Sequence, residues 1–363
     1  MPRIALSLSL TILGCALVLI SSAQNAPRPT SSPTPAQTSS LPGAMGLEAG
    51  DVQEALSIIQ RRYLDPKAVS GPELHRATLD GLLSRLGRGV MLLPSSTPSS
   101  PSDPFYREIL DGHIGYLRPG DLSRAQLQEL DTTLRGFAGK KVDAIILDLR
   151  GALESNDYAA ATEFASRFVP KDKLLFSLNE PGANPPREFV SKQEPLYSGL
   201  MIILVDHETA GATEALAGAI HFYDRTVIIG ETTAGRALDY ADEALRNGRI
   251  LRVAVAEVIL PDRRPRYLKG LAPDLAIAFS PDQKHEIFQQ SLTKGMASFA
   301  FEADRPHLNE AALLAGTNPE VDPAQSYRSR PGEKLSLHDP VLQRAVDLVT
   351  SIGVYEKQPG RPP

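Results

Sequence analysis

The chain has 363 residues, a formal net charge of -5 and a pI near 5.9, and 42% of its residues are hydrophobic. Its mild acidity, together with the lack of a Lys/Arg run, argues against nucleic acid or an anionic membrane surface as partner, because both require clustered positive charge. The length suggests about two domains.

Residues 1–23 have the pattern of a secretory signal peptide. Arg3 provides the positive end, the stretch from Ile4 to Ile20 is apolar, and small residues lead up to Ala23. We therefore expect an extracytoplasmic protein, either periplasmic or secreted. Two alternatives stay open: an uncleaved segment that anchors the chain in the membrane, and lipidation at Cys15.

Cys15 is the only cysteine of the chain. Cleavage after residue 23 would leave no thiol, which excludes a disulfide, a cysteine nucleophile and a thiolate metal site. The sequence also lacks a His-Glu-x-x-His pattern, a Gly-x-Ser-x-Gly elbow, a phosphate-binding loop and a dinucleotide fingerprint. We accordingly expect neither a cofactor nor a metal ion.

The next segments alternate between linkers and helices. Residues 24–49 are rich in Pro, Ser and Thr, which is typical of an extended linker. Residues 50–93 form a predicted N-terminal helical region, because apolar residues recur at helical spacing after Asp51 and again after Gly71. Residues 94–105 form a second linker rich in Pro and Ser.

Residues 106–279 alternate between apolar strands and amphipathic helices, which predicts an α/β core with a mixed sheet and crossover helices. An Asn-Gly turn signal before Arg249 indicates a hairpin. Residues 280–363 form a predicted C-terminal helical extension. We expect strands at 113–118, 142–150, 173–178, 200–205, 226–230, 241–245 and 250–260, and helices at 122–137, 158–168, 210–223, 281–294 and 338–352.

Two segments of the core carry related motifs. Residues 204–220 read Leu-Val-Asp-His-Glu-Thr-Ala-Gly-Ala-Thr-Glu-Ala-Leu-Ala-Gly-Ala-Ile, and residues 227–237 read Val-Ile-Ile-Gly-Glu-Thr-Thr-Ala-Gly-Arg-Ala. They resemble the nucleophile helix and the base-bearing turn of the C-terminal processing (tail-specific) serine proteases. That family reads approximately Ser-Ala-Ser-Ala-Ser-Glu at the first place and Gly-Glu-x-Thr-x-Gly-Lys-Gly at the second.

The order of the remaining motifs strengthens the resemblance: a Gly-Tyr-Leu strand, an Ile-Leu-Asp-Leu-Arg strand and a Gly-Leu-Ala-Pro-Asp segment. The resemblance implies a ClpP/crotonase-like core. Many members carry a PDZ domain at the place where this chain has only residues 94–105, so we expect a PDZ-less member. The alternative is an unrelated secreted α/β domain.

The resemblance implies a Ser-Lys dyad at positions that here hold Gly211, three residues before Glu214, and Arg236. Glycine has no hydroxyl, and a guanidinium is not deprotonated in proteins. We therefore expect a degenerate dyad. Other roles stay open: Gly211 as a helix N-cap, Glu214 in capping, and Arg236 either in a surface ion pair or as a fixed charge that holds a carboxylate.

The loop that supplies the oxyanion hole in the family also differs. The family follows Asp-Leu-Arg with an Asn-x-Pro-Gly-Gly-like sequence, whereas this chain continues from Gly151 to Glu154 and Ser155 in place of the two glycines. A carboxylate beside the hole would oppose a developing oxyanion.

Three hydroxyls near the motifs are candidates for a displaced nucleophile: Thr209, Thr213 and Ser155. His207 and His221 flank the same helix and are candidate bases. Our first hypothesis is a pseudo-peptidase that binds peptide or protein segments. The alternatives are an active serine-type endopeptidase with a displaced nucleophile, and a purely structural domain.

Overall fold

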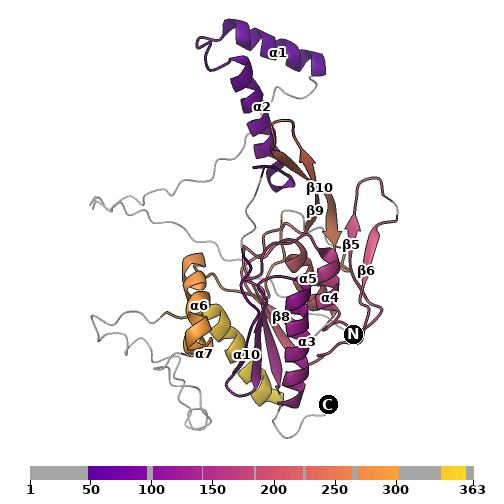
Figure 1. Ribbon diagram of the computed structural model, residues 1–363, viewed down its shortest axis with the longest axis vertical. Coiled ribbons are helices and arrows are strands. Elements are labelled where there is room, and N and C mark those ends of the chain that lie inside the picture. Colours follow the sequence, from indigo (N-terminus) through magenta and orange to yellow (C-terminus); the bar gives the residue numbers. More distant parts are fainter. Residues whose placement is uncertain are drawn as a thin grey trace, which may run out of the picture. The chain divides into compact units, whose positions relative to one another are not determined.

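The computed structural model describes residues 48–95, 101–140, 142–183, 185–223, 226–263, 269–301 and 337–356 (Figure 1). The expected signal peptide, Cys15 and most of the first linker lie outside the described residues. Within the described part, no helix combines the length and the apolarity that crossing a bilayer requires.

The chain divides into two compact units, one ending at Leu74 and the other starting at the next residue. The first contains α1 (Ala49–Arg62) and the first turn of α2 (Gly71–Leu86), both at the positions that the apolar periodicity predicts. A capping box starts α1: the backbone N–H of Glu48 donates to the carboxylate of Asp51 at 2.8 Å.

The second unit is built around a six-stranded sheet with the order β11-β8-β7-β4-β3-β2. All neighbours run parallel except β2 and β3, so the sheet is mixed and the predicted fold class is confirmed. Sequence patterns predicted the four central strands but neither edge strand. The strands are β2 (Tyr106–Leu110), β3 (Ile114–Arg118), β4 (Ala144–Asp148), β7 (Leu200–Val205), β8 (Thr226–Gly230) and β11 (Leu275–Ala276).

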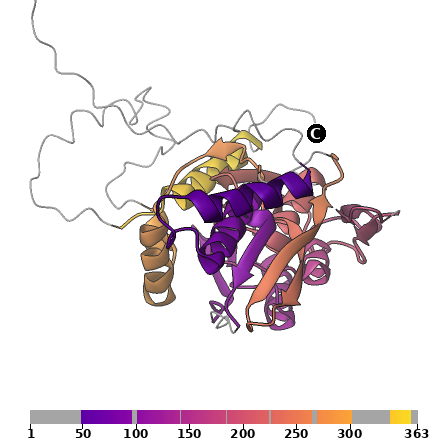
Figure 2. The same ribbon diagram turned by 90° about the horizontal axis from the view of Figure 1, so that it is seen from above.

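Helices cover both faces of this sheet. Ile145 and Leu147 point into a core formed with α3, α4 and α5, whereas Ala144 and Ile146 point into a core formed with α6, α7 and α10. The last two helices lie side by side in both views (Figure 1, Figure 2). Because neither face is solvated, β4 is buried along its whole length. The helices are α3 (Arg124–Gly139), α4 (Tyr158–Ala165), α5 (Gly211–Tyr223), α6 (Pro281–Lys294), α7 (Ala297–Ala300) and α10 (Pro340–Glu356).

A second, antiparallel sheet holds the predicted hairpin, whose turn contains Gly248 at a φ of 80°. Sequence analysis did not predict β1, β6 or the separation of these strands from the central sheet. At the end of the order β1-β10-β5-β6, strand β6 pairs with β5 alone among the described strands. The strands are β1 (Val90–Leu93), β5 (Leu174–Asn179), β6 (Arg187–Val190), β9 (Leu238–Ala244) and β10 (Ile250–Ile259).

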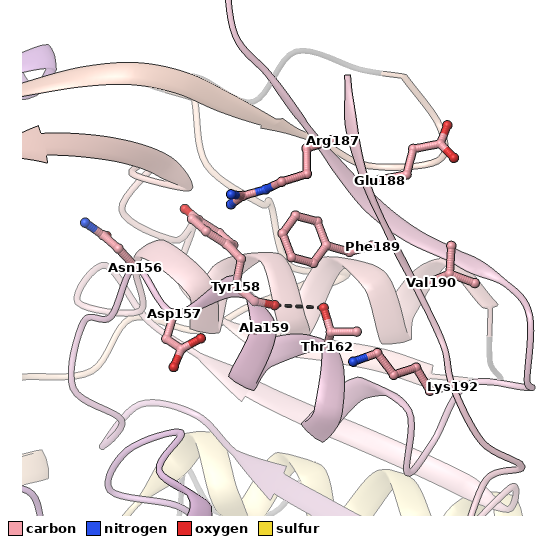
Figure 3. A pocket seen from close by; sticks show the side chains of 10 residues that line it. All are labelled: Asn156, Asp157, Tyr158, Ala159, Thr162, Arg187, Glu188, Phe189, Val190 and Lys192. Carbon is pink, nitrogen blue, oxygen red and sulfur yellow. Dashed lines mark hydrogen bonds between the residues drawn. The ribbon is translucent and has the colours of Figure 1, made fainter. Parts of the chain in front are cut away.

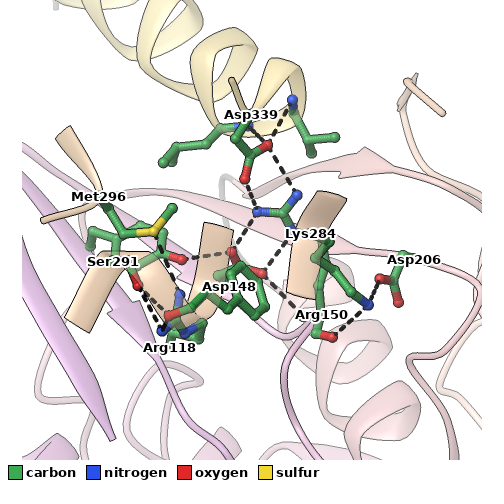
Figure 4. A network of polar contacts seen from close by, with 12 residues as sticks. Arg118, Asp148, Arg150, Asp206, Lys284, Ser291, Met296 and Asp339 are labelled. Atoms are coloured by element: carbon green, nitrogen blue, oxygen red, sulfur yellow. Dashed lines mark hydrogen bonds and ion pairs between the residues drawn. The ribbon is translucent and has the colours of Figure 1, made fainter. Parts of the chain in front are cut away.

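A buried ion-pair network anchors the loop that leaves β4 (Figure 4). The guanidinium of Arg150 donates to both oxygens of Asp148 and to both oxygens of Asp339, over 2.6–3.1 Å. The Tyr116 hydroxyl also donates to Asp148 at 2.7 Å. Burial alone would raise the pKa of Asp148, but the charge and hydrogen bonds of Arg150 lower it below the usual 3.8. The network therefore holds a charged carboxylate inside the protein.

Asp339 tests this network. It also accepts the backbone N–H of Leu342 at the start of α10, at 3.0 Å. We expect Asp339→Ala to lower the free energy of unfolding by about 3–5 kcal/mol, because it leaves Arg150 under-compensated and the helix uncapped. Asp242→Ala, which breaks an exposed pair with Arg252, should change it by no more than about 1 kcal/mol. Equal losses in urea denaturation would contradict the assigned role.

Candidate functional site

Gly211 begins α5 and lies directly against the loop that follows β4. The backbone of Gly211 bridges to that of Ser155, and the N–H of Ala212 donates to the Ser155 carbonyl oxygen at 2.7 Å. This N–H is one of the donors that a helix leaves unsatisfied in its first turn. The loop therefore occupies a backbone donor that an oxyanion site at this helix end would use.

Position 211 has no room for a side chain. Its φ is 61°, a conformation that favours glycine. A Cβ placed there would lie 2.4 Å from the Ser155 carbonyl oxygen and 3.5 Å from the Cγ of Glu154. Both the backbone conformation and the close approach of the loop require glycine at Gly211.

The substitution Gly211→Ala tests this packing. We expect it to lower the free energy of unfolding by about 1–3 kcal/mol, because alanine is strained at this φ and meets a carbonyl oxygen. Gly136→Ala is the matched control: Gly136 is exposed within α3, and a Cβ there meets nothing within 4 Å. The control should be neutral or stabilise by up to about 1 kcal/mol. Similar effects in thermal or urea denaturation would refute the argument.

Arg236 lies on the other side of Glu154. Its Nε donates to Oε1 at 3.0 Å and its Nη2 to Oε2 at 2.8 Å, so the guanidinium holds the carboxylate with two bonds. The side chains are 23% and 39% exposed, respectively. The structure therefore brings Gly211, Arg236 and the loop residues Glu154 and Ser155 together: Ser155 is bonded to the start of α5, and Glu154 is bonded to Arg236. The sequence indicates the charge of Glu154 but not this pairing, although Glu154 and Arg236 both depart from the family motifs and carry opposite charges.

Glu214 supports the Arg236 turn from within α5. It is buried, and its Oε2 accepts the backbone N–H of Arg236 at 3.0 Å. Burial raises the pKa of Glu214 above the usual 4.5, while hydrogen bonds from Thr233 and the Arg236 backbone oppose the rise. The carboxyl group is thus more easily protonated in the folded chain than in the unfolded chain.

This pKa shift predicts how the free energy of unfolding depends on pH. Because the pKa of Glu214 is higher in the folded state, the group stabilises the fold at a pH below its unfolded-state pKa. This stabilisation is lost as the pH rises through the folded-state pKa. Gln at position 214 resembles the protonated, neutral acid at every pH. When the pH is raised from 4 to 8, Glu214→Gln should therefore become more stable relative to the native chain. Glu163→Gln should do the opposite, because Lys192 lowers the pKa of Glu163. Urea denaturation of both variants and of the native chain at the two pH values measures these changes. A change of the same sign in both variants would contradict the opposite pKa shifts of Glu214 and Glu163.

The candidate displaced nucleophiles lie near the site. The hydroxyls of Thr209 and Ser155 have other partners, whereas that of Thr213 is buried without a hydrogen-bond partner among the described residues. Thr209 Oγ1 accepts the backbone N–H of Asp206 at 3.1 Å, and Ser155 Oγ accepts that of Asp157 at 3.0 Å. Thr213 is fully buried within α5. In the part of the chain that the structure describes, none of the three hydroxyls is hydrogen-bonded to a histidine or a lysine, which an activated nucleophile needs.

The candidate bases are also engaged elsewhere. His207 pairs with Glu231 at 2.8 Å, and His221 pairs with Asp274 at 3.1 Å. The buried Lys284 pairs with two carboxylates at 2.5 and 2.6 Å, those of Asp206 and Glu208. Among the described residues, no group of three His, Cys, Asp or Glu side chains is placed to hold a metal ion.

A cavity of about 430 Å³ lies between the start of α4 and strand β6 (Figure 3). Tyr158 and Thr162 line it from the helix, and Arg187 and Phe189 line it from the strand. The Tyr158 hydroxyl donates at 2.8 Å to the carbonyl oxygen of Leu238, two residues after the turn residue 236. The cavity is thus adjacent to the degenerate site. Sequence analysis did not predict it, because β6 itself was missed.

The family model described as peptidase family S41 matches residues 113–277, which include both motifs and the loop between them. A carboxyl-terminal-processing protease of Synechocystis sp. is 28% identical over 165 residues, or 44% of this chain and 37% of the relative. The carboxy-terminal processing protease CtpA of Bacillus subtilis is 26% identical over 194 residues, or 53% of this chain and 41% of the relative.

Residues 113–277 of this chain match peptidase family S41, and the relatives named above are C-terminal processing proteases. The predicted family is therefore confirmed. The chain spans only about two fifths of the length of these S41 relatives, 37% and 41%. Among solved structures, the photosystem II D1 C-terminal processing protease is similar with a TM-score of 0.41 and 20% identity, covering 52% of this chain and 47% of that chain.

Proposed function

We propose that this S41 chain is a pseudo-peptidase that binds an extended peptide or protein segment without cleaving it. One observation carries the proposal: the Glu154 carboxylate is bound by Arg236, and its Cγ lies 3.5 Å from the place that a Cβ at position 211 would take, so one side chain lies next to both positions where the family places its nucleophile and base. The reacting carbonyl of a substrate would have to lie next to the same two positions.

Three separate features oppose catalysis. Gly211 offers no hydroxyl, and loss of the nucleophile in a serine protease lowers turnover about a million-fold, or ~8 kcal/mol of barrier. Arg236 cannot act as a general base, because its guanidinium stays protonated. The N–H of Ala212 is already hydrogen-bonded to the loop, and that loop carries the Glu154 carboxylate in place of a glycine, which opposes binding of an oxyanion there.

Two features support binding of an extended segment. Strand β6 ends its sheet among the described strands, and such an edge presents unpaired backbone groups to which a peptide can add as a further strand. The residues that line the cavity beside this edge include the partly exposed Phe189. We place the protein outside the cytoplasm, periplasmic or secreted, because Arg3, the apolar stretch after it and the small residues before residue 24 have the pattern of an export signal.

Turnover assays test the proposal. Purified protein incubated with unstructured peptides should release no fragments, as measured by mass spectrometry. The double substitution Gly211→Ser with Arg236→Lys should stay inactive, because the serine would be strained at a φ of 61° and would meet the Ser155 carbonyl oxygen, and the loop would still lack the family's two glycines. Cleavage by the native chain that disappears on substituting Thr209, Thr213 or Ser155 with Ala would establish the displaced nucleophile instead.

Removing the loop obstacle is the sharper comparison. Adding Glu154→Gly and Ser155→Gly to the double substitution restores the family's glycines, which frees the helix N-terminus and removes the negative charge. We expect any recovered hydrolysis to occur in this fourfold variant and not in the twofold variant. Activity of the twofold variant alone would show that the loop does not block the site.

A further inference from the structure

The Arg236 side chain is placed to bind a carboxylate, and in this structure it binds that of Glu154 from the same chain. We call Arg236 the carboxylate receptor and Glu154 its occupant. Its Nε and Nη2 donate to separate oxygens of Glu154, at 3.0 and 2.8 Å. This two-bond arrangement is the one in which a guanidinium binds a carboxylate from any source. Both side chains are partly exposed, at 23% and 39%, so solvent and solutes reach the pair.

The receptor keeps its position independently of its occupant. The backbone N–H of Arg236 donates to buried Glu214 at 3.0 Å, and its carbonyl oxygen accepts the N–H of Leu238 at 2.7 Å. The Glu154 carboxylate, in contrast, is held by a partly exposed ion pair, which contributes only about 0–1 kcal/mol, so its side chain can turn away while the loop backbone stays in place. A ligand carboxylate with even modest additional contacts would displace it.

The neighbouring cavity supplies such contacts. Asn156, which lines the cavity, follows Glu154 by two residues, so the occupant and the cavity wall belong to one short loop. The Phe189 ring, which is partly exposed and lies 6.4 Å from the buried ring of Tyr158, offers apolar surface to a side chain of the ligand (Figure 3).

We propose that Arg236 binds a carboxylate of an extended peptide ligand, and that Glu154 occupies this receptor when the ligand is absent. The inference rests on the proposed peptide-binding function and specifies its ligand. The carboxylate comes either from the C-terminus of the peptide or from an Asp or Glu side chain, since both present the same planar group. The space next to the ion pair accepts the adjoining apolar residue.

Binding measurements with matched peptides test the proposal. The probes are three short peptides of alternating Val and Ser ending in Leu: one with a free C-terminal acid, one amidated, and one amidated with a central Glu. Isothermal titration calorimetry with the full chain should show at least one carboxylate peptide binding about tenfold more tightly than the plain amide. The tighter of the two identifies the source of the carboxylate.

Two substitutions locate the effect. Glu154→Gln removes the internal competitor and should tighten binding of the carboxylate peptide about two- to fivefold. Arg236→Gln should abolish the preference for the carboxylate over the amide. The matched control is Glu129→Gln, which makes the same charge change at the exposed pair with Arg107, away from the residues that line the cavity. The control should leave all affinities unchanged, and thermal unfolding verifies that each variant is folded.

The outcomes separate this inference from the proposed function. Equal affinity for acid and amide peptides, unchanged by Arg236→Gln, overturns the receptor while leaving a non-catalytic peptide-binding protein. Absence of binding by the native chain and by Glu154→Gln overturns both the receptor and peptide binding. Fragmentation of the peptides overturns only the loss of catalysis, because a carboxylate preference that depends on Arg236 would still support the receptor.

Discussion

The hydrogen bond from the Ala212 N–H to the Ser155 carbonyl oxygen fixes the arrangement of the whole site. It ties the loop after β4 to the first turn of α5, over a glycine whose φ of 61° admits this approach. Once the loop is held there, Glu154 extends toward the turn after β8 and meets Arg236. The geometry of the site thus follows from one backbone contact and the absence of a Cβ.

Anchors at both ends of the loop make this contact durable. At the start, Arg150 is bound to Asp148 and Asp339, which ties the end of β4 to the beginning of α10. At the other end, Asp157 caps α4 by accepting the N–H of Ala160 at 2.9 Å. A segment of a few residues between two fixed points has little conformational freedom to lose. Its position against α5 therefore requires only modest contact energy of its own.

The central part of the fold could be predicted from the sequence because its strands and helices have strong sequence patterns. Fully apolar runs such as that of β4, buried on both faces, and the small-residue helix α5 have patterns that tertiary packing reinforces. Of the strands that were not predicted, β1 and β6 have four residues each and no clean alternation between apolar and polar positions. Such segments become strands because a neighbour pairs with them, and that neighbour is distant in sequence.

The same distinction applies to the site. The departures from the family motifs at Gly211, Arg236 and Glu154 could be recognised from the sequence, because each can be compared with a motif position. Their contacts could not be predicted, because no sequence pattern indicates that a carboxylate binds a guanidinium 82 residues away. The cavity next to Tyr158 was invisible for a related reason, since one of its walls is a strand that the pattern did not predict.

The contacts also show why the three departures are coupled. Glu154 without Arg236 would place a carboxylate, unneutralised, beside a crowded helix end, and Arg236 without Glu154 would leave a partly buried guanidinium without its carboxylate. A side chain at position 211 would push the Ser155 carbonyl away, breaking the bond to Ala212 and moving Glu154 with it. Changes at these sites are therefore expected to be non-additive. A catalytic arrangement cannot be rebuilt by exchanging one residue at a time, because each exchange disturbs the contacts that the others depend on.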